Sequence, residues 1–202
     1  MSDFLENKSV QVYADSICLF SKAGLKCIQE LNTNLSKTEQ ESSRCDLAPL
    51  QSLEILLEFI YLYLHLTSRM ASGIVEFDET EKLINVLSSK CINAAIKFGL
   101  FGLQQEAKDK IRQKAFKNFI KVDAEYSKYF KLLPEGNVGA EDTLFSQFSK
   151  NIASIAGIER GRWAYNNACL KIIMHALQKM NPNQFIKNLR GKKDQESSSV
   201  TD

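Results

Sequence analysis

Acid, imidazole, phenol and guanidinium groups converge at one place in this sequence, the apolar stretch from Leu50 to Arg69. Five side chains recur there at spacings of four, three, four and four residues, and we call them the polar stripe: Glu54, Glu58, Tyr61, His65 and Arg69. At about 100° per residue, these spacings place all five within roughly 80° of one another on a helix. Leucine, isoleucine, phenylalanine and tyrosine occupy nearly all the other positions. The pattern predicts a narrow polar edge on an otherwise buried helix.

The polar stripe has two interpretations that the sequence leaves open. In the first, it is the solvated edge of a central helix, with its charged groups hydrated at i,i+4 spacing. In the second, it faces a neighbouring helix or an internal cavity, where desolvated groups must pair or bind a metal or small polar ligand. Glu58 would then act as base or metal ligand, His65 as acid–base group or ligand, and Arg69 as clamp for an anion. Burial separates the two interpretations.

A metal centre and the common catalytic motifs have little support in this sequence. Carboxylate-bridged dimetal bundles need a Glu-x-x-His motif on each of two helices, and none occurs here. With His65 and His175 as the only histidines, a histidine-based site would need both of them and a carboxylate such as Glu58. Nucleophile-elbow, Walker and Rossmann patterns do not occur either. We therefore predict no metal, the sequence names no cofactor, and an enzyme is not the favoured class.

A second pattern predicts a long helix from about Leu103 to Leu133. Five lysines, which we call the lysine ridge, fall within roughly 60° of one another along about 27 Å of this helix: Lys110, Lys114, Lys117, Lys121 and Lys128. The opposite face is apolar: Ile111, Ala115, Phe119, Val122, Tyr126, Phe130 and Leu133. We favour a solvated surface helix. The functional alternative is a ridge that binds nucleic acid, phosphate or an acidic protein, although no aromatic residues interleave the lysines for base stacking.

Five cysteines, Cys18, Cys27, Cys45, Cys91 and Cys169, are scattered without a Cys-x-x-Cys pair, and their odd number leaves one unpaired in any disulfide scheme. We interpret them as thiols of a reducing cytoplasm. Cys18 and Cys169 have apolar neighbours, whereas Cys45 lies in a polar stretch and is the best candidate for a reactive thiol.

The run from Glu159 to Trp163 brings two arginines and the only tryptophan to an expected helix start. Arginine and tryptophan are enriched at binding hot spots, yet a single tryptophan is more often an anchor of the core. We favour the anchor. Downstream, His175 lies on a wide polar face and is expected to be exposed.

Composition describes an ordinary globular chain of 202 residues, 44% apolar and 25% charged, with a net charge of +2. Such a charge supplies no whole-molecule field for nucleic acid or anionic lipid. The N-terminus lacks the basic and apolar regions of a signal peptide. The most apolar segment, 53–66, is too short for a membrane helix and holds two glutamates. We expect no membrane partner.

Apolar residues at a 3.6-residue period predict an all-α, single-domain bundle of about five to seven mostly antiparallel helices. We expect helices near 3–35, 49–71, 79–98, 103–133, 141–156 and 159–180, followed by a short amphipathic turn. An Asp78-to-Glu81 capping box should open the third. The domain covers 1–190, and 191–202 should form a disordered polar tail.

These observations favour a cytosolic, non-enzymatic interaction or regulatory protein, whose partner is another protein or a second copy in a homodimer. The alternative from another class is a bundle with an internal ligand site at the polar stripe, which could extend to catalysis. A third interpretation places nucleic acid or another anion on the lysine ridge, and we do not favour it. The first rests on missing motifs and on fold-level analogy.

Overall fold

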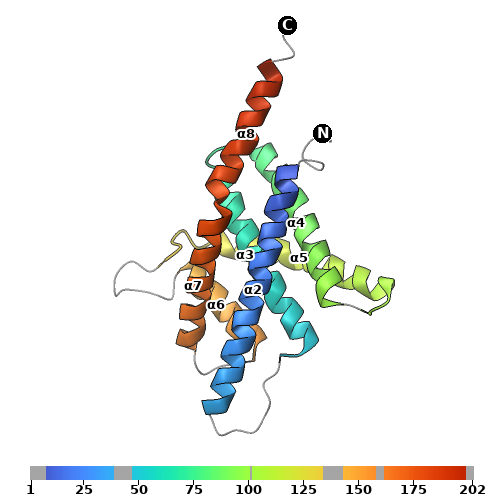
Figure 1. Cartoon of the computed structure of the whole chain (residues 1–202), viewed down its shortest axis with the longest axis vertical. Helices are drawn as coiled ribbons and strands as arrows, with labels where there is room; N and C mark the ends of the chain where they lie inside the picture. Colours follow the sequence, from blue (N-terminus) through green and yellow to red (C-terminus); the bar gives the residue numbers. More distant parts are fainter. Residues whose placement is uncertain (1–7, 39–46, 101, 134–142, 158–161, 199–202) are drawn as a thin grey trace.

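The computed structural model describes residues 8–38, 47–100, 102–133, 143–157 and 162–198; for 35–38, 162–166 and 191–198 it describes the backbone alone. The predicted all-α bundle is confirmed, and no strand occurs in these ranges. The helices are α2 (Lys8–Thr38), α3 (Pro49–Ala71), α4 (Phe77–Gly99), α5 (Gln105–Tyr126), α6 (Leu144–Ile155), α7 (Arg162–Met180) and α8 (Pro182–Ser198). Figure 1 shows their order along the chain.

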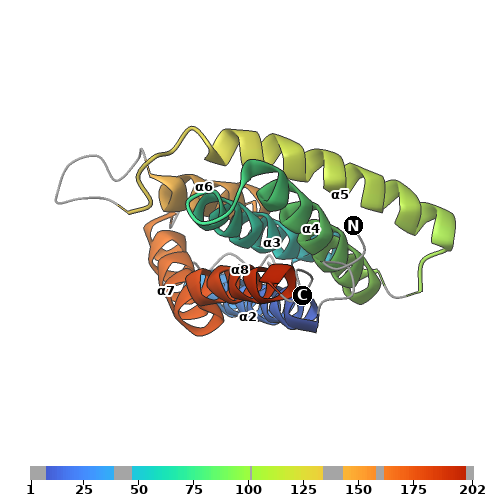
Figure 2. The ribbon, with the colours of Figure 1, turned by 90° about the horizontal axis from the view of Figure 1, so that it is seen from above.

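Helix α3 is the centre of the bundle. It packs against α2, α4, α5, α6 and α8, and the view from above in Figure 2 shows it between α5 on one side and α2 with α8 on the other. From Leu53 to Thr67, every residue except Glu54 is buried. Proline at the first helical position fits the start of α3, because its missing N–H would have no partner there. The bounds expected for this helix are confirmed at both ends.

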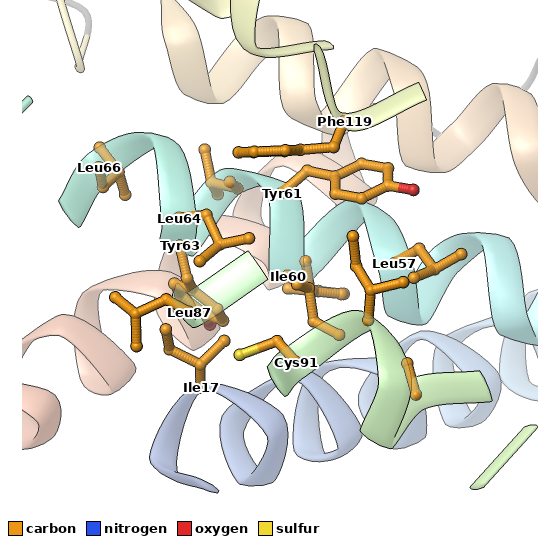
Figure 3. Packing of buried hydrophobic residues seen from close by; sticks show 14 of the residues in the cluster. Ile17, Leu57, Ile60, Tyr61, Tyr63, Leu64, Leu66, Leu87, Cys91 and Phe119 are labelled. Carbon is orange, nitrogen blue, oxygen red and sulfur yellow. The ribbon is translucent and has the colours of Figure 1, made fainter. Parts of the chain in front are cut away.

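The core around α3 is built from aliphatic and aromatic side chains of neighbouring helices. Figure 3 shows part of it, with Ile17, Leu57, Ile60, Tyr61, Tyr63, Leu64, Leu66, Leu87, Cys91 and Phe119 labelled. The rings of Phe59 and Phe148 meet edge to face at 5.0 Å and join α3 to α6. Such geometry is favourable because the positive ring edge meets the negative ring face.

Helix α5 is shorter than the sequence predicted. It ends at Tyr126 rather than near Leu133, where the N–H groups of residues 128 and 129 bond the carbonyls three residues back, and the carbonyls of residues 129 to 132 accept bonds from outside α5. Arg69 donates to the carbonyls of Tyr129 and Phe130, and the N–H groups of residues 144 and 145 donate to the carbonyls of residues 131 and 132. The expected apolar row therefore stops early, and Phe130 is 86% exposed.

Two further helix ends differ in how they are capped: the start of α4 and the junction of α7 with α8 at Asn181. The predicted capping box at Asp78 is wrong: Glu76 precedes α4, and its side chain makes no capping bond. Asn181 separates α7 from α8 with a φ of 45°, a left-handed conformation that asparagine tolerates. Its Oδ1 accepts from the N–H of Gln184 and caps α8.

Helix α8 continues to Ser198, past the expected domain boundary at residue 190. The disordered tail expected for 191–202 stays a prediction. Among the described helices, none combines the length and the apolar character needed to cross a membrane.

Gly24 of α2 marks the tightest contact with α3. A Cβ built there would lie 2.7 Å from Cζ of Phe59, whose side chain is fully buried. Gly24→Ala should therefore lower the free energy of unfolding by about 1–2 kcal/mol, because overpacking outweighs the better helix propensity of alanine. Urea denaturation measures this loss. Gly73→Ala is the matched control, since its methyl would meet nothing closer than the Met70 carbonyl at 3.7 Å. A stabilised Gly24→Ala protein would contradict the packing described.

Candidate functional site

The polar stripe faces helix α5. Tyr61 Oη donates to the carbonyl of Ala115 at 2.8 Å, and His65 Nδ1 lies 2.8 Å from Oδ1 of Asp123. In these two contacts and in the bond from Arg69 to the carbonyl of Tyr129, the paired residues are between 54 and 60 positions apart in the sequence. A constant separation means that α3 and α5 run in the same direction, as expected for helices separated by one antiparallel neighbour.

Glu58 is the hub of a buried hydrogen-bond network. Its Oε1 accepts from Tyr126 Oη at 2.5 Å and from Asn151 Nδ2 at 2.7 Å. Gln147 Nε2 donates to Asn151 Oδ1, and Tyr129 Oη donates to Gln147 Oε1. The network joins α3, α5 and α6 around a carboxyl group that is only 5% exposed. We call these five residues the Glu58 network.

Burial governs the protonation of the Glu58 network. Loss of water around the carboxyl raises the pKa of Glu58, and the hydrogen bonds from Tyr126 and Asn151 oppose that rise. Burial also raises the pKa of Tyr126, as does the nearby carboxyl group. Desolvation is the larger effect on both groups, so the neutral forms are favoured inside the bundle. A neutral carboxylic acid suits a packed interior, because burying an ionised carboxylate costs much more free energy.

His65 is held in a similarly closed place. Its ring is 2% exposed, its Nδ1 contacts Asp123, and its edge meets the Tyr126 ring at a centroid distance of 5.6 Å. Its Nε2 is buried and finds no hydrogen-bond partner in the described part of the chain. A catalytic imidazole must reach its substrate through such a nitrogen, but here protein atoms enclose it.

Glu54 and Arg69, the first and last residues of the polar stripe, are not buried like the three between them. Glu54 is on the rim, with its carboxylate 4.0 Å from Lys114 Nζ and its side chain 53% exposed. Arg69 is half-buried, and its guanidinium donates hydrogen bonds to the carbonyls of Tyr129 and Phe130, at 2.8 and 3.0 Å. Four of the five residues therefore make contacts between α3 and either α5 or the chain just after α5. Glu54 lies at the exposed edge of this interface.

The arrangement stabilises a helix interface and offers little access to a ligand. Among the described residues, no group of three histidine, cysteine, aspartate or glutamate side chains could hold a metal ion. Neither of the two cavities described below is lined by a residue of the polar stripe. The exposed-edge interpretation holds for Glu54 alone, whereas Glu58, Tyr61 and His65 are buried.

Sequence reasoning missed the partners of the stripe. Tyr126 was assigned to an apolar row, and Asp123, Gln147 and Asn151 were not singled out. Gln147 and Asn151 are four residues apart on α6 and hydrogen-bond each other. This i,i+4 pair of amides on one helix was the available signal.

The lysine ridge is exposed along its whole length. Lys110 pairs with Glu106 at 2.7 Å, and Lys114 approaches Glu54. Lys128 lies beyond the end of α5, so the predicted helical row of five is wrong at its last member. Exposed ion pairs of this kind contribute little to stability. The ridge as an anion site stays a prediction.

Two of the cavities that open at the surface of the bundle are lined entirely by described residues. The first, of about 460 Å³, lies between α2, α3 and α4, and we call it the lysine-rimmed groove; its lining residues are Lys22, Leu25, Lys26, Gln29, Pro49, Ser52, Leu53, Leu56, Phe98 and Gly99. The second, of about 560 Å³, lies between the start of α2 and the junction of α7 with α8, and is lined largely by polar side chains. Neither was predicted from sequence, because each depends on how helices meet.

The remaining candidates have mixed outcomes. Cys45 and the side chains of the Glu159-to-Trp163 run lie outside the described residues. His175 is exposed as expected, and its ring meets Phe20 at 6.2 Å. Cys169 is buried, which raises the pKa of its thiol to about 12.

Comparison of the chain with protein-family models, with curated proteins and with solved structures finds no match. The class of the protein, an all-α bundle with a polar network between its central helix and two neighbours, therefore follows from its own structure.

Replacing Glu58 by glutamine tests the buried acid. Because the pKa of Glu58 in the folded protein is raised above its ordinary value of 4.5, the stability that this group contributes is fully present below about pH 4.5. It is lost as the pH rises through the folded pKa. Glu58→Gln keeps an acceptor for Tyr126 and cannot lose a proton. Its stability relative to the original protein should rise with pH, by at most about 1.4 kcal/mol per unit.

Urea denaturation of both proteins between pH 4.5 and 8 measures this difference. Glu54→Gln, on the exposed rim of the polar stripe, is the matched control and should follow the original protein. A stability gap between Glu58→Gln and the original protein that stays constant or shrinks as pH rises would contradict a raised pKa.

Proposed function

We propose that this protein is a non-enzymatic helical interaction protein of the cytoplasm, which binds an acidic, amphipathic helix of a partner protein in the lysine-rimmed groove. The observation that carries the proposal is the groove itself, an apolar hollow of about 460 Å³ with lysines on its rim. A cavity of this size can take a few apolar side chains, as in complexes where a helix lays its apolar face into a groove.

The lining of the groove suits apolar anchors. Leu25, Leu53 and Leu56 form its floor, which is buried. Phe98 stands at the edge and is 54% exposed, although a ring of this size gains from burial. An apolar helix face placed here would cover these side chains.

The charge around the groove selects the partner. Lys22 and Lys26 line it, and none of the described lining residues is acidic. Lys22 Nζ lies 4.2 Å from the centre of the Phe98 ring, so a cation is fixed at the apolar edge. The first turn of α3 also contributes Pro49 and Ser52, which brings the positive end of the helix dipole close. Carboxylates flanking an apolar stripe complement this field.

The polar stripe supports a non-enzymatic function over the catalytic alternative. Its acid and imidazole make contacts between helices and do not line the groove. Residues able to move protons are therefore separated from the surface able to bind. The lysine ridge keeps the anion-binding function as a second candidate, because all of its lysines are exposed.

A designed peptide tests the proposal. The probe is a fluorescein-labelled amphipathic helix with leucines at i, i+4 and i+7 and flanking glutamates, followed by fluorescence anisotropy. Binding should weaken as salt is added. The pair Lys22→Glu and Lys26→Glu should reduce affinity by roughly tenfold or more, since rim charges then repel the peptide. Lys117→Glu with Lys121→Glu, which changes the charge equally on the lysine ridge, is the matched control and should bind normally.

Three results would overturn the proposal. The first is an equal affinity for a peptide with lysines in place of the glutamates. The second is loss of binding in the control variant alone, which would favour the lysine ridge. The third comes from sedimentation velocity without peptide: a dimer that Lys22→Glu with Lys26→Glu dissociates would make a second copy the occupant.

A further inference from the structure

We propose that Cys18 of α2 and Cys91 of α4 form an oxidisable thiol pair, in which Cys18 reacts with a hydroperoxide and Cys91 closes a disulfide between the two helices. The inference goes beyond the proposed function and does not depend on it. It begins from two cysteines 73 residues apart in sequence that meet across one helix interface.

The two thiols are in mutual contact. Cys18 Sγ lies 4.0 Å from the carbonyl oxygen of Cys91, and Cys91 Sγ lies 3.7 Å from the carbonyl oxygen of Ala14, one turn before Cys18. Each sulfur therefore reaches the backbone of the other helix, and the two thiols are close enough to shift each other's pKa. Ala14, Cys18 and Cys91 are all small, which lets α2 and α4 approach closely. A disulfide needs this proximity, because it spans only a short distance between Cβ atoms.

The environments of the two sulfurs divide the roles between them. Cys18 is half-buried and reachable from solvent, whereas Cys91 is fully buried. The hydrogen bond from Cys91 lowers the pKa of Cys18, and the charge of Lys22 adds to this, against burial and Asp15. The same hydrogen bond and burial raise the pKa of Cys91. A thiolate is the form that attacks peroxide, so Cys18 is the attacking group and Cys91 the resolving one.

The reaction balances with one hydroperoxide for each pair. The Cys18 thiolate attacks a peroxide oxygen, the O–O bond breaks, and with hydrogen peroxide the departing hydroxide takes up a proton as water. Cys18 is now a sulfenic acid. The Cys91 sulfur gives up its proton and attacks the Cys18 sulfur; the S–S bond forms, and the second oxygen leaves as water. Two thiols and one hydrogen peroxide become one disulfide and two waters.

The other cysteines supply a sharp comparison. Cys27, on the same helix, is more exposed than Cys18, and its thiol has no such partner among the residues that the structure describes. Accessibility alone would make Cys27 the first to oxidise, whereas the pairing with Cys91 makes it Cys18. Cys169 is buried beside Ser149 and should react last.

The test uses the full chain, reduced and then treated with one equivalent of hydrogen peroxide. Free thiols are blocked with N-ethylmaleimide, and the protein is studied by intact mass and non-reducing peptide mapping. We expect a loss of about 2 Da before blocking and two fewer N-ethylmaleimide adducts after it, with the Cys18 and Cys91 peptides linked. Cys27→Ser should behave identically. Closing so long a loop should also raise the midpoint of thermal unfolding, and reductant should reverse the rise.

Two variants separate the steps. Cys91→Ser should accumulate a Cys18 sulfenic acid that dimedone traps, and Cys18→Ser should leave Cys91 reduced. Circular dichroism checks that each variant folds, and the mapping of the unsubstituted protein stands even if one does not. Faster oxidation of Cys27 than of Cys18, a disulfide linking any other pair, or two reduced thiols after treatment would overturn the proposal.

Discussion

The whole structure depends on the burial of α3. On a helix with neighbours on nearly every side, polar groups are stabilised where those neighbours supply hydrogen-bond partners, because an unpaired buried polar group costs free energy comparable to a lost hydrogen bond. Glu58, Tyr61 and His65 are buried, and each contacts α5. Helix α5 is therefore fixed in register along α3 by polar contacts as well as by apolar packing. Removing those partners would leave a carboxyl and an imidazole without solvent or support.

The same constraint explains where α5 ends. Periodicity along 103–133 predicts one continuous helix, since nothing before Pro134 breaks it. Arg69 nevertheless takes the carbonyls of residues 129 and 130, and the start of α6 takes those of 131 and 132. The N–H groups of residues 128 and 129 bond the carbonyls three residues back, so α5 closes in a tight turn after Tyr126, and contacts with α3 and α6 hold the segment that follows. Local sequence contains no trace of a competitor that lies 60 residues away.

Much of the fold was therefore readable from local pattern, and the site only in part. Pro49 and the apolar run after it predicted the bounds of α3, and the spacing of Glu58, Tyr61 and His65 correctly grouped them on one face. Their burial was not predictable, because it depends on whether another helix covers that face. Asn151 and Gln147 come from a helix about 90 residues further along the chain. The period of apolar residues predicts which side chains share a helix face, but it does not predict which element packs against that face.

The division between the polar stripe and the lysine-rimmed groove also bears on function. Residue types that suggest chemistry, namely Glu58 and His65, are enclosed by protein, while the lysine-rimmed groove, which opens at the surface, is lined mainly by leucine, phenylalanine, lysine and small or amide side chains. Two walls of that groove are α2 and α4, and these are the helices that Cys18 and Cys91 would join. A disulfide there would restrict the relative motion of the two walls without touching Leu53 and Leu56, the part of the floor that α3 supplies. Under the proposed function, oxidation would act on binding through the width of the groove, and the Glu58 network on the far side of α3 would hold Leu53 and Leu56 in place.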